Sequence, residues 1–149
     1  MFIFFCRVLY SLNNFIKENQ SLVSAELVTS SNMNTLKKAD IICCATTAQK
    51  PVFEDQHLKP GVHINGIGSF KPDMQEIPEE TIRRSRLIVD SKEACLKEAG
   101  DIIIPLQKQL IAESHIFAEL GELVEKEKPW QRDDYDISVF KSVGNSVQD

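Results

Sequence analysis

The stretch Val62-His-Ile-Asn-Gly-Ile-Gly-Ser-Phe-Lys-Pro-Asp-Met-Gln-Glu-Ile77 decides how the rest of the sequence is interpreted. It opens with a short apolar run, and Gly66 and Gly68 then precede a polar segment that contains a proline. This pattern is typical of a buried parallel strand that ends at a ligand crevice, because small residues let a ligand approach the backbone. We therefore predict a strand whose carboxyl end borders a binding crevice.

A second run of this kind, Ala39-Asp-Ile-Ile-Cys-Cys-Ala-Thr-Thr47, lies upstream and ends in small hydroxyl residues. Strands alternating with helices predict an α/β fold with a mostly parallel sheet and flanking helices. Besides these two runs, we predict strands at residues 2–10, 25–29, 87–90, 102–105 and 137–140. Helices are predicted at residues 15–20, 30–38, 78–85, 90–99 and 114–127, with a last one opening after the glycine turn in 142–149.

The helix predicted at residues 90–99 carries signals at both ends. Asp90 with Glu93 three residues later resembles a capping box, in which two side chains satisfy the first backbone N–H groups of a helix. Gly100 fits the position just after the helix, where a left-handed residue often ends it. We therefore predict that this helix stops at Gly100.

Composition and charge exclude several classes of partner. The chain has 149 residues, of which 42% are apolar and 26% charged, as expected for one ordinary globular domain. The net charge of −5 argues against a nucleic-acid binder, which needs concentrated Lys and Arg. The apolar start at residues 1–6 is far shorter than the roughly 20 residues of a membrane span, and a strand is favoured there over a degenerate signal sequence. We expect neither nucleic acid nor a membrane as partner.

The cysteines and histidines do not predict a metal site. The four cysteines form no C-x-x-C pair, and no histidine stands at metal-ligand spacing from them. Cys43 and Cys44 lie within an apolar strand and are expected to be small buried hydrophobic residues. His63 alternates with Ile64 and is expected to be structural. Reduced thiols fit a cytoplasmic protein.

Taken alone, these residues identify no reaction. The sequence contains no Ser/His/Asp set, no P-loop and no G-x-G-x-x-G, and Gly66-x-Gly68 without a third glycine is a weak signal. They indicate only that a ligand binds at the strand ends.

Several motifs in the same order resemble the ornithine cyclodeaminase/mu-crystallin family. They are Ala39-Asp-Ile-Ile-Cys-Cys-Ala-Thr-Thr47, Leu58-Lys-Pro-Gly-Val-His-Ile-Asn-Gly-Ile-Gly-Ser69, Pro72-Asp-Met-Gln-Glu76, Val89-Asp-Ser91 and Phe140-Lys-Ser-Val-Gly-Asn-Ser-Val-Gln-Asp149. The likeness extends from about residue 37 to residue 149. It implies a Rossmann-type NAD(P)-binding domain within a larger homodimeric enzyme. The family reduces imino acids, oxidises certain amino acids, or cyclises ornithine to proline with loss of ammonia.

The resemblance also implies which residues surround the nicotinamide end of NAD or NADP. Thr46 corresponds to the hydroxyl residue that contacts the cofactor after the family's fourth strand. The backbone segment after the next strand is Ile67, Gly68 and Ser69, and the later loop near the nicotinamide is Ser142, Val143 and Gly144. Hydride transfer requires the reacting carbons to come within about 3–3.5 Å, so small and rigidly placed groups suit these positions. The protein supplies placement, and the cofactor supplies the chemistry.

One departure from the family pattern concerns the acid/base residue. In ornithine cyclodeaminases an aspartate follows the glycine pair, whereas Phe70 stands here and cannot exchange a proton. This shifts the interpretation from ornithine cyclisation towards imino-acid reductases and amino-acid dehydrogenases. Asp73 is a candidate for the missing acid/base residue. The favoured alternative is that Asp73 is a loop carboxylate that caps the turn after Pro72. The catalytic residues stay unknown.

The larger departure is that the sequence has no counterpart of the family's first strand, its glycine-rich phosphate loop or its substrate domain. In the usual order 3-2-1-4-5-6 the first strand is central, and its loss leaves two unpaired edges unless residues 1–10 fill the gap. The missing loop would also hold the pyrophosphate. We therefore expect a fragment: one partial NAD(P)-binding domain over residues 1–149, with residues 1–14 doubtful, that binds cofactor weakly and is inactive alone. The alternative is a non-catalytic protein, either a mu-crystallin-like binder of small ligands or the product of a decayed gene.

Overall fold

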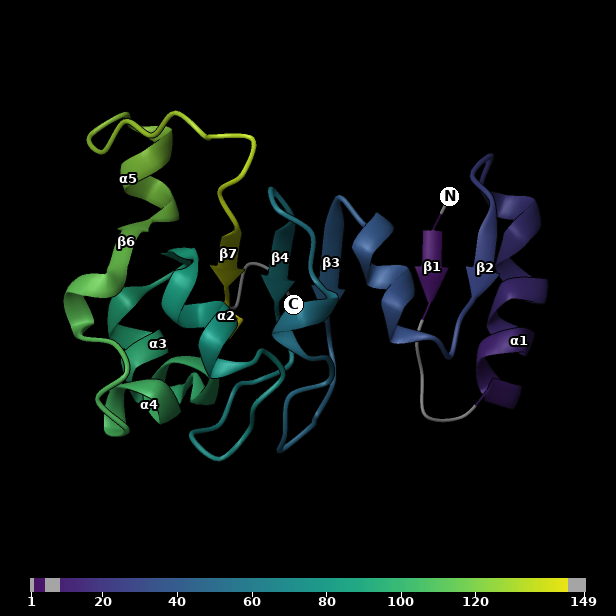
Figure 1. Ribbon diagram of the computed structural model, residues 1–149, viewed down its shortest axis with the longest axis horizontal. Coiled ribbons are helices and arrows are strands. Elements are labelled where there is room, and N and C mark those ends of the chain that lie inside the picture. The colour runs from purple at the N-terminus through teal and green to yellow at the C-terminus, as the bar shows by residue number, and fades with distance from the viewer. Residues whose placement is uncertain (1, 5–8, 145–149) are drawn as a thin grey trace. The chain divides into compact units, whose positions relative to one another are not determined.

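The computed structural model describes residues 2–4 and 9–144 (Figure 1). The chain divides into two compact units, Met1–Thr35 and Leu36–Asp149. Each unit is described by itself below.

The N-terminal unit is built on a pair of short parallel strands, β1 (Phe2–Phe4) and β2 (Leu27–Thr29). Helix α1 (Leu9–Asn19) and the 3-10 turn η1 (Gln20–Leu22) connect them, as parallel strands require a long crossover. The prediction of one strand over residues 2–10 is therefore wrong at its end, because α1 already begins at Leu9. Residues 5–8 lie outside the described part of the chain.

The second unit contains a five-stranded sheet in the order β3-β4-β7-β5-β6. Every neighbouring pair is parallel, and in Figure 1 the arrows of β3, β4 and β7 point the same way. The strands are β3 (Ile41–Cys44), β4 (His63–Gly66), β7 (Ser138–Lys141), β5 (Arg86–Val89) and β6 (Ile116–Glu119). This sheet confirms the predicted α/β class with a parallel sheet.

The core of this unit is formed by apolar side chains of the central strands and of the helices that cover them. Ile64, Leu87 and Val139 are fully buried, as are Ile82 and Ile102 from two helices. Each such side chain stabilises the fold by about 1.5–3 kcal/mol relative to an exposed position. The central strands and these two helices therefore share one apolar core.

Strand β3 exposes alternate residues, since successive side chains of a strand point to opposite faces. Ile42 and Cys44 are buried, whereas Ile41 and Cys43 are exposed. The prediction that both neighbouring cysteines are buried is therefore wrong for Cys43.

Helices and 3-10 turns connect the strands. They are η2 (Met33–Lys38), η3 (Asp55–His57), α2 (Glu79–Arg84), α3 (Lys92–Glu98), α4 (Gly100–Gln107), η4 (Glu113–His115) and α5 (Leu120–Val124). The segment predicted as a helix over 30–38 is the 3-10 helix η2. No helix in the described residues has the length and apolarity that a membrane crossing needs.

The predicted strand over residues 102–105 is wrong. The run Ile102-Ile-Ile-Pro105 lies inside α4, where Ile102 and Pro105 are buried. The predicted end of the preceding helix is confirmed, since α3 ends at Glu98 with Ala99 as its C-cap and Gly100 in the next position. Gly100 is not left-handed, however, and it is the first residue of α4. Burial of an apolar face overrides the strand preference of β-branched residues in so short a run.

The predicted helix over residues 114–127 is also wrong. Its first half is strand β6, in which Ile116 and Ala118 are buried and the residues between and after them are partly exposed. Only Leu120–Val124 is helical, as α5, and Leu120 and Val124 are exposed. The period of two along β6 fits pairing with β5 better than a continuous helix. At the other end of the chain, residues 142–144 are not helical, and 145–149 lie outside the described residues.

Candidate functional site

The three sequence segments predicted to surround a nicotinamide ring follow three neighbouring strands. Thr46 follows β3, residues 67–69 follow β4, and residues 142–144 follow β7. The backbone N–H of Ile67 donates to the carbonyl of Cys44 at 2.8 Å, and that of Ser142 donates to the carbonyl of Gly66 at 3.1 Å. The structure therefore brings all three segments to one edge of the sheet, at the carboxyl ends of parallel strands.

Gly68 is the point of closest approach between the first two segments. A Cβ atom at this position would lie 2.0 Å from the carbonyl oxygen of Thr46 and 2.3 Å from its nitrogen. Only glycine fits here, and the two loops form one continuous backbone surface.

Exposure divides the predicted residues into two kinds. Thr46, Ile67 and Gly144 are exposed, and Gly68 and Val143 are partly exposed. These five residues are accessible to a ligand at the carboxyl ends of β3, β4 and β7, where the sequence predicts the crevice.

The two predicted serines are buried instead. Ser69 donates its hydroxyl proton to the carbonyl of Met74 at 2.8 Å and accepts from the N–H of Asp101 at 3.2 Å. Ser142 donates its hydroxyl proton to Asp90 at 2.6 Å. These side chains hold the loops in place and point away from the crevice.

Asp90 fastens the loop after β7. Its carboxylate accepts from the hydroxyl of Ser142, the N–H of Val143 at 3.2 Å and the N–H of Ser91 at 2.7 Å. Partial burial opposes ionisation, but the hydrogen bonds, led by that of Ser142, hold the pKa of Asp90 below its ordinary value. The predicted capping role of Asp90 is wrong, because α3 is capped by the Ser91 hydroxyl, which accepts from the N–H of Ala94 at 3.3 Å.

Glu76 fastens the loops after β3 and β4. It is fully buried, and its carboxylate accepts from the backbone N–H groups of Gly68 at 2.8 Å, Ser69 at 3.1 Å and Thr46. In the sequence, the motif Pro72-Asp-Met-Gln-Glu76 indicates only a resemblance to the family and no role for Glu76. Nothing local in it indicates contacts with a residue 30 positions away.

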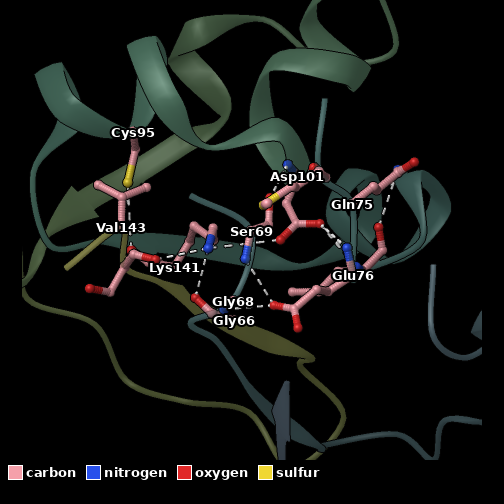
Figure 2. A network of polar contacts seen from close by, with 12 residues as sticks. Gly66, Gly68, Ser69, Gln75, Glu76, Cys95, Asp101, Lys141 and Val143 are labelled. Atoms are coloured by element: carbon pink, nitrogen blue, oxygen red, sulfur yellow. Dashed lines mark hydrogen bonds and ion pairs between the residues drawn. The ribbon is translucent and has the colours of Figure 1, made fainter. Parts of the chain in front are cut away.

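A buried Lys141–Asp101 pair lies beside Glu76 (Figure 2). The ammonium of Lys141 donates to the carbonyls of Gly66 at 3.0 Å and Ser142 at 2.8 Å, and lies 3.9 Å from Asp101 Oδ2. Burial lowers the pKa of Lys141 and raises that of Asp101 to about 6. Through Lys141, the pair connects the end of β4 at Gly66 with the start of the loop after β7 at Ser142.

Phe70 and Asp73 follow the crevice on an exposed turn. Phe70 is 41% exposed, and the ammonium of Lys71 lies 5.8 Å from its ring centre. Asp73 is exposed and accepts from Gln49 Nε2 at 3.5 Å. Phe70 therefore presents an aromatic surface where the cyclodeaminases have a carboxylate.

A shallow cavity of about 320 Å³ lies at the opposite end of the sheet. Its lining comes from residues just before or at the start of β5, β6 and β7, among them Arg84, Arg86, His115 and Ile137. Open parallel sheets bind ligands outside the carboxyl ends of their strands. We therefore take the crevice at that end, and not the cavity, as the candidate site.

The chemistry of the crevice fits one part of a nicotinamide dinucleotide. Gly68 leaves bare backbone at its floor, Ile67 offers an exposed apolar side chain, and Thr46 an exposed hydroxyl. These groups suit a flat ring with an amide, whereas the sequence has no G-x-G-x-x-G to hold the diphosphate. Within the described residues, no cluster of three or more His, Cys, Asp or Glu could bind a metal ion.

A parallel sheet with flanking helices, whose loops meet at the carboxyl ends of adjacent strands, defines the Rossmann-type class of α/β protein. The model of the ornithine cyclodeaminase/mu-crystallin family matches residues 5–149, a longer range than the motifs quoted above. The chain belongs to the ornithine cyclodeaminase/mu-crystallin family.

Several relatives are substantially similar to this chain. The Δ1-pyrroline-2-carboxylate reductase of Bacillus cereus is 42% identical over 141 residues, which are 94% of this chain and 42% of that protein. The ketimine reductase mu-crystallin of Macropus fuliginosus is 42% identical over 122 residues, 82% of this chain and 36% of that protein. The chain thus spans less than half the length of the curated relatives it matches.

A solved structure agrees with both fold and family. The Δ1-pyrroline-2-carboxylate reductase of Thermococcus litoralis, in complex with NADH and L-proline, matches with a TM-score of 0.90 and 38% identity. The match covers 95% of this chain and 44% of the archaeal one.

Proposed function

We propose that this chain supplies the nicotinamide side of the cofactor site in an NAD(P)-dependent imino-acid reductase or amino-acid dehydrogenase. The observation that carries the proposal is the meeting of Thr46, Ile67 and Ser142 segments at the carboxyl ends of β3, β4 and β7. The Thermococcus litoralis complex with NADH and L-proline supports a nicotinamide cofactor and a small cyclic imino acid as substrate.

Each loop has a distinct task in this proposal. The exposed hydroxyl of Thr46 would donate to the cofactor, and the backbone at Ile67 and Gly68 would support its nicotinamide ring. Val143 and Gly144 form the wall on the β7 side. The cofactor, when bound, supplies the hydride, while these groups orient the ring and exclude water from one of its faces.

Phe70 favours the reductase or dehydrogenase branch over ornithine cyclisation. Its ring can neither accept nor release a proton, so the step that needs an aspartate in the cyclodeaminases has no residue at this position. An aromatic wall instead suits the apolar part of a cyclic imino acid. We assign no acid/base residue to this chain.

The proposal treats residues 1–149 as one partial cofactor domain. Without a glycine-rich loop in the sequence, the diphosphate is held weakly, so we expect weak NAD(P)H binding and no turnover by the chain alone. We further propose a cytoplasmic location, in keeping with the free thiols of Cys43, Cys44 and Cys95.

The proposal is tested by titrating the purified chain with NADH and recording saturation-transfer NMR. We expect no saturation at micromolar NADH, with stronger transfer to nicotinamide than to adenine protons. Thr46→Val should weaken that transfer. The matched control Thr47→Val removes the exposed hydroxyl of the neighbouring residue and should leave the transfer unchanged.

Two outcomes contradict the proposal. Stronger transfer to adenine than to nicotinamide protons would refute the assigned site. Saturable micromolar binding, or oxidation of NADH or NADPH in the presence of Δ1-pyrroline-2-carboxylate, would refute the expectation of a weak and inactive chain.

A further inference from the structure

Within the described residues, the Glu76 carboxylate accepts its hydrogen bonds from the backbone of the loops after β3 and β4. Its side chain is fully buried, and the three N–H groups that it accepts from belong to Thr46 after β3 and to Gly68 and Ser69 after β4. One side chain thus joins two loops that are separate in sequence.

Converging backbone N–H groups at a loop form the kind of concavity that binds an external anion. Here the anion is part of the protein, since both oxygens of Glu76 are engaged: one by Thr46, the other by Gly68 and Ser69. Charge-assisted hydrogen bonds offset the cost of burying a carboxylate. This corner therefore has no free N–H groups on these three residues for a phosphate.

The backbone of Glu76 is itself fixed. Its N–H donates to Asp101 Oδ1 at 2.8 Å, and Asp101 lies 3.9 Å from the ammonium of Lys141. Lys141 in turn donates to the carbonyl of Gly66 (Figure 2). A continuous set of buried polar contacts therefore runs from the β3 loop to the β7 strand end.

We propose that Glu76 is a positioning residue of the nicotinamide site, a built-in anion that holds Thr46 and Gly68 at contact distance from the ring. The inference rests on the proposed function, since the ring is the ligand that these loops would hold. It follows that this corner rejects phosphate and carboxylate groups and accepts an uncharged or cationic ring face.

Two substitutions separate charge from length. Glu76→Gln keeps the side-chain volume but replaces one acceptor oxygen by an NH2 group, which faces a backbone N–H without a bond. Glu76→Asp keeps the carboxylate on a shorter chain and should retain part of the effect. Ile82→Val and Ile82→Ala, in the fully buried part of α2, provide controls with matched thermal stability.

The experiment combines amide hydrogen exchange with saturation transfer to NADH. In Glu76→Gln we expect exchange at Thr46, Gly68 and Ser69 to quicken by at least about tenfold, as loss of a charge-assisted hydrogen bond implies. We expect transfer to the nicotinamide protons to fall with it, Glu76→Asp to lie between, and the Ile82 control of equal Tm to keep both signals.

The outcomes distinguish this inference from the proposed function. Faster exchange with unchanged nicotinamide transfer in Glu76→Gln overturns the positioning role and leaves the proposed function standing. Protected amides without any nicotinamide transfer in the unmodified chain overturn both. Equal losses in the Ile82 control also overturn the positioning role, because general destabilisation then explains them. If Glu76→Gln does not fold, Glu76→Asp against the control decides the question.

Discussion

The two ends of the five-stranded sheet carry charge in different ways. At the carboxyl end, Glu76 and Lys141 are fully buried and bond to backbone atoms of the loops. At the amino end, Arg86 and Asp136 are each more than a third exposed, 3.9 Å apart, and Arg86 lies over the Phe117 ring at 4.7 Å. Half-exposed pairs contribute little to stability, whereas an unpaired buried charge is costly. The end where buried charges hold the loops is therefore the end where we place the function.

The largest effect should come from breaking the buried pair. Lys141→Met leaves Asp101 without its cation and removes the ammonium that donates to the carbonyls of Gly66 and Ser142. We expect the free energy of unfolding to fall by about 3–5 kcal/mol, measured by urea denaturation. The double variant Lys141→Met/Asp101→Asn should recover part of this loss, and a loss below about 1 kcal/mol in the single variant would remove the contrast between the two ends.

A methyl group in the crevice floor should have the next largest effect. Gly68→Ala places Cβ against the backbone of Thr46, so we expect a loss of about 1–3 kcal/mol from overpacking. Gly121→Ala is the matched control, because nothing lies within 4 Å of a Cβ there and alanine favours the helix α5. Thermal unfolding of both variants checks this, and equal Tm values would show that the two loops do not touch.

The pH dependence of stability should reveal the raised pKa of Asp101. The folded chain keeps this proton up to a pKa of about 6, while the unfolded chain releases it near pH 4. Between these values the folded state binds more protons, so this carboxyl's contribution to stability falls as the pH rises. The difference in unfolding free energy between the unmodified chain and Asp101→Asn should therefore decrease from pH 4 to 6, and a constant difference would contradict the assignment.

The smallest effect is expected at the amino end. Asp136→Asn removes the partner of Arg86, but both side chains keep solvent contact and Arg86 keeps its aromatic neighbours. We expect a change within about 0.5 kcal/mol by urea denaturation. A loss of unfolding free energy comparable to that of Lys141→Met would mean that charged pairs stabilise both ends of the sheet equally.

The sequence was most informative where a strand stops. The runs that became β3 and β4 end in small residues, and both strands were predicted within a mostly parallel sheet. It was least informative in short apolar runs that the structure placed in the other kind of element, as at Ile102 in α4 and Ile116 in β6. In runs of four residues the periods of helix and strand cannot be told apart, and packing decides.

The site was predictable at the backbone and not behind it. Thr46 and Gly68 were predicted from motifs. Glu76 and Asp101 accept hydrogen bonds from backbone N–H groups that are distant in the sequence, so nothing in their neighbouring residues indicates their role. Lys141 could have been found, because it stands at a spacing of two from the buried Val139 of β7 and the buried Ile137 just before that strand. A lysine in phase with a core pattern indicates a buried cation.

Gly100 limits how the crevice can move. A Cβ there would lie 1.9 Å from the carbonyl oxygen of Met74 and 2.8 Å from that of Lys71, so the start of α4 rests directly on the turn at residues 71–74. Ser69 ties the same turn through its bond to Met74. The turn at residues 71–74 is therefore packed directly against the start of α4. We expect any displacement of this turn to move α4 with it.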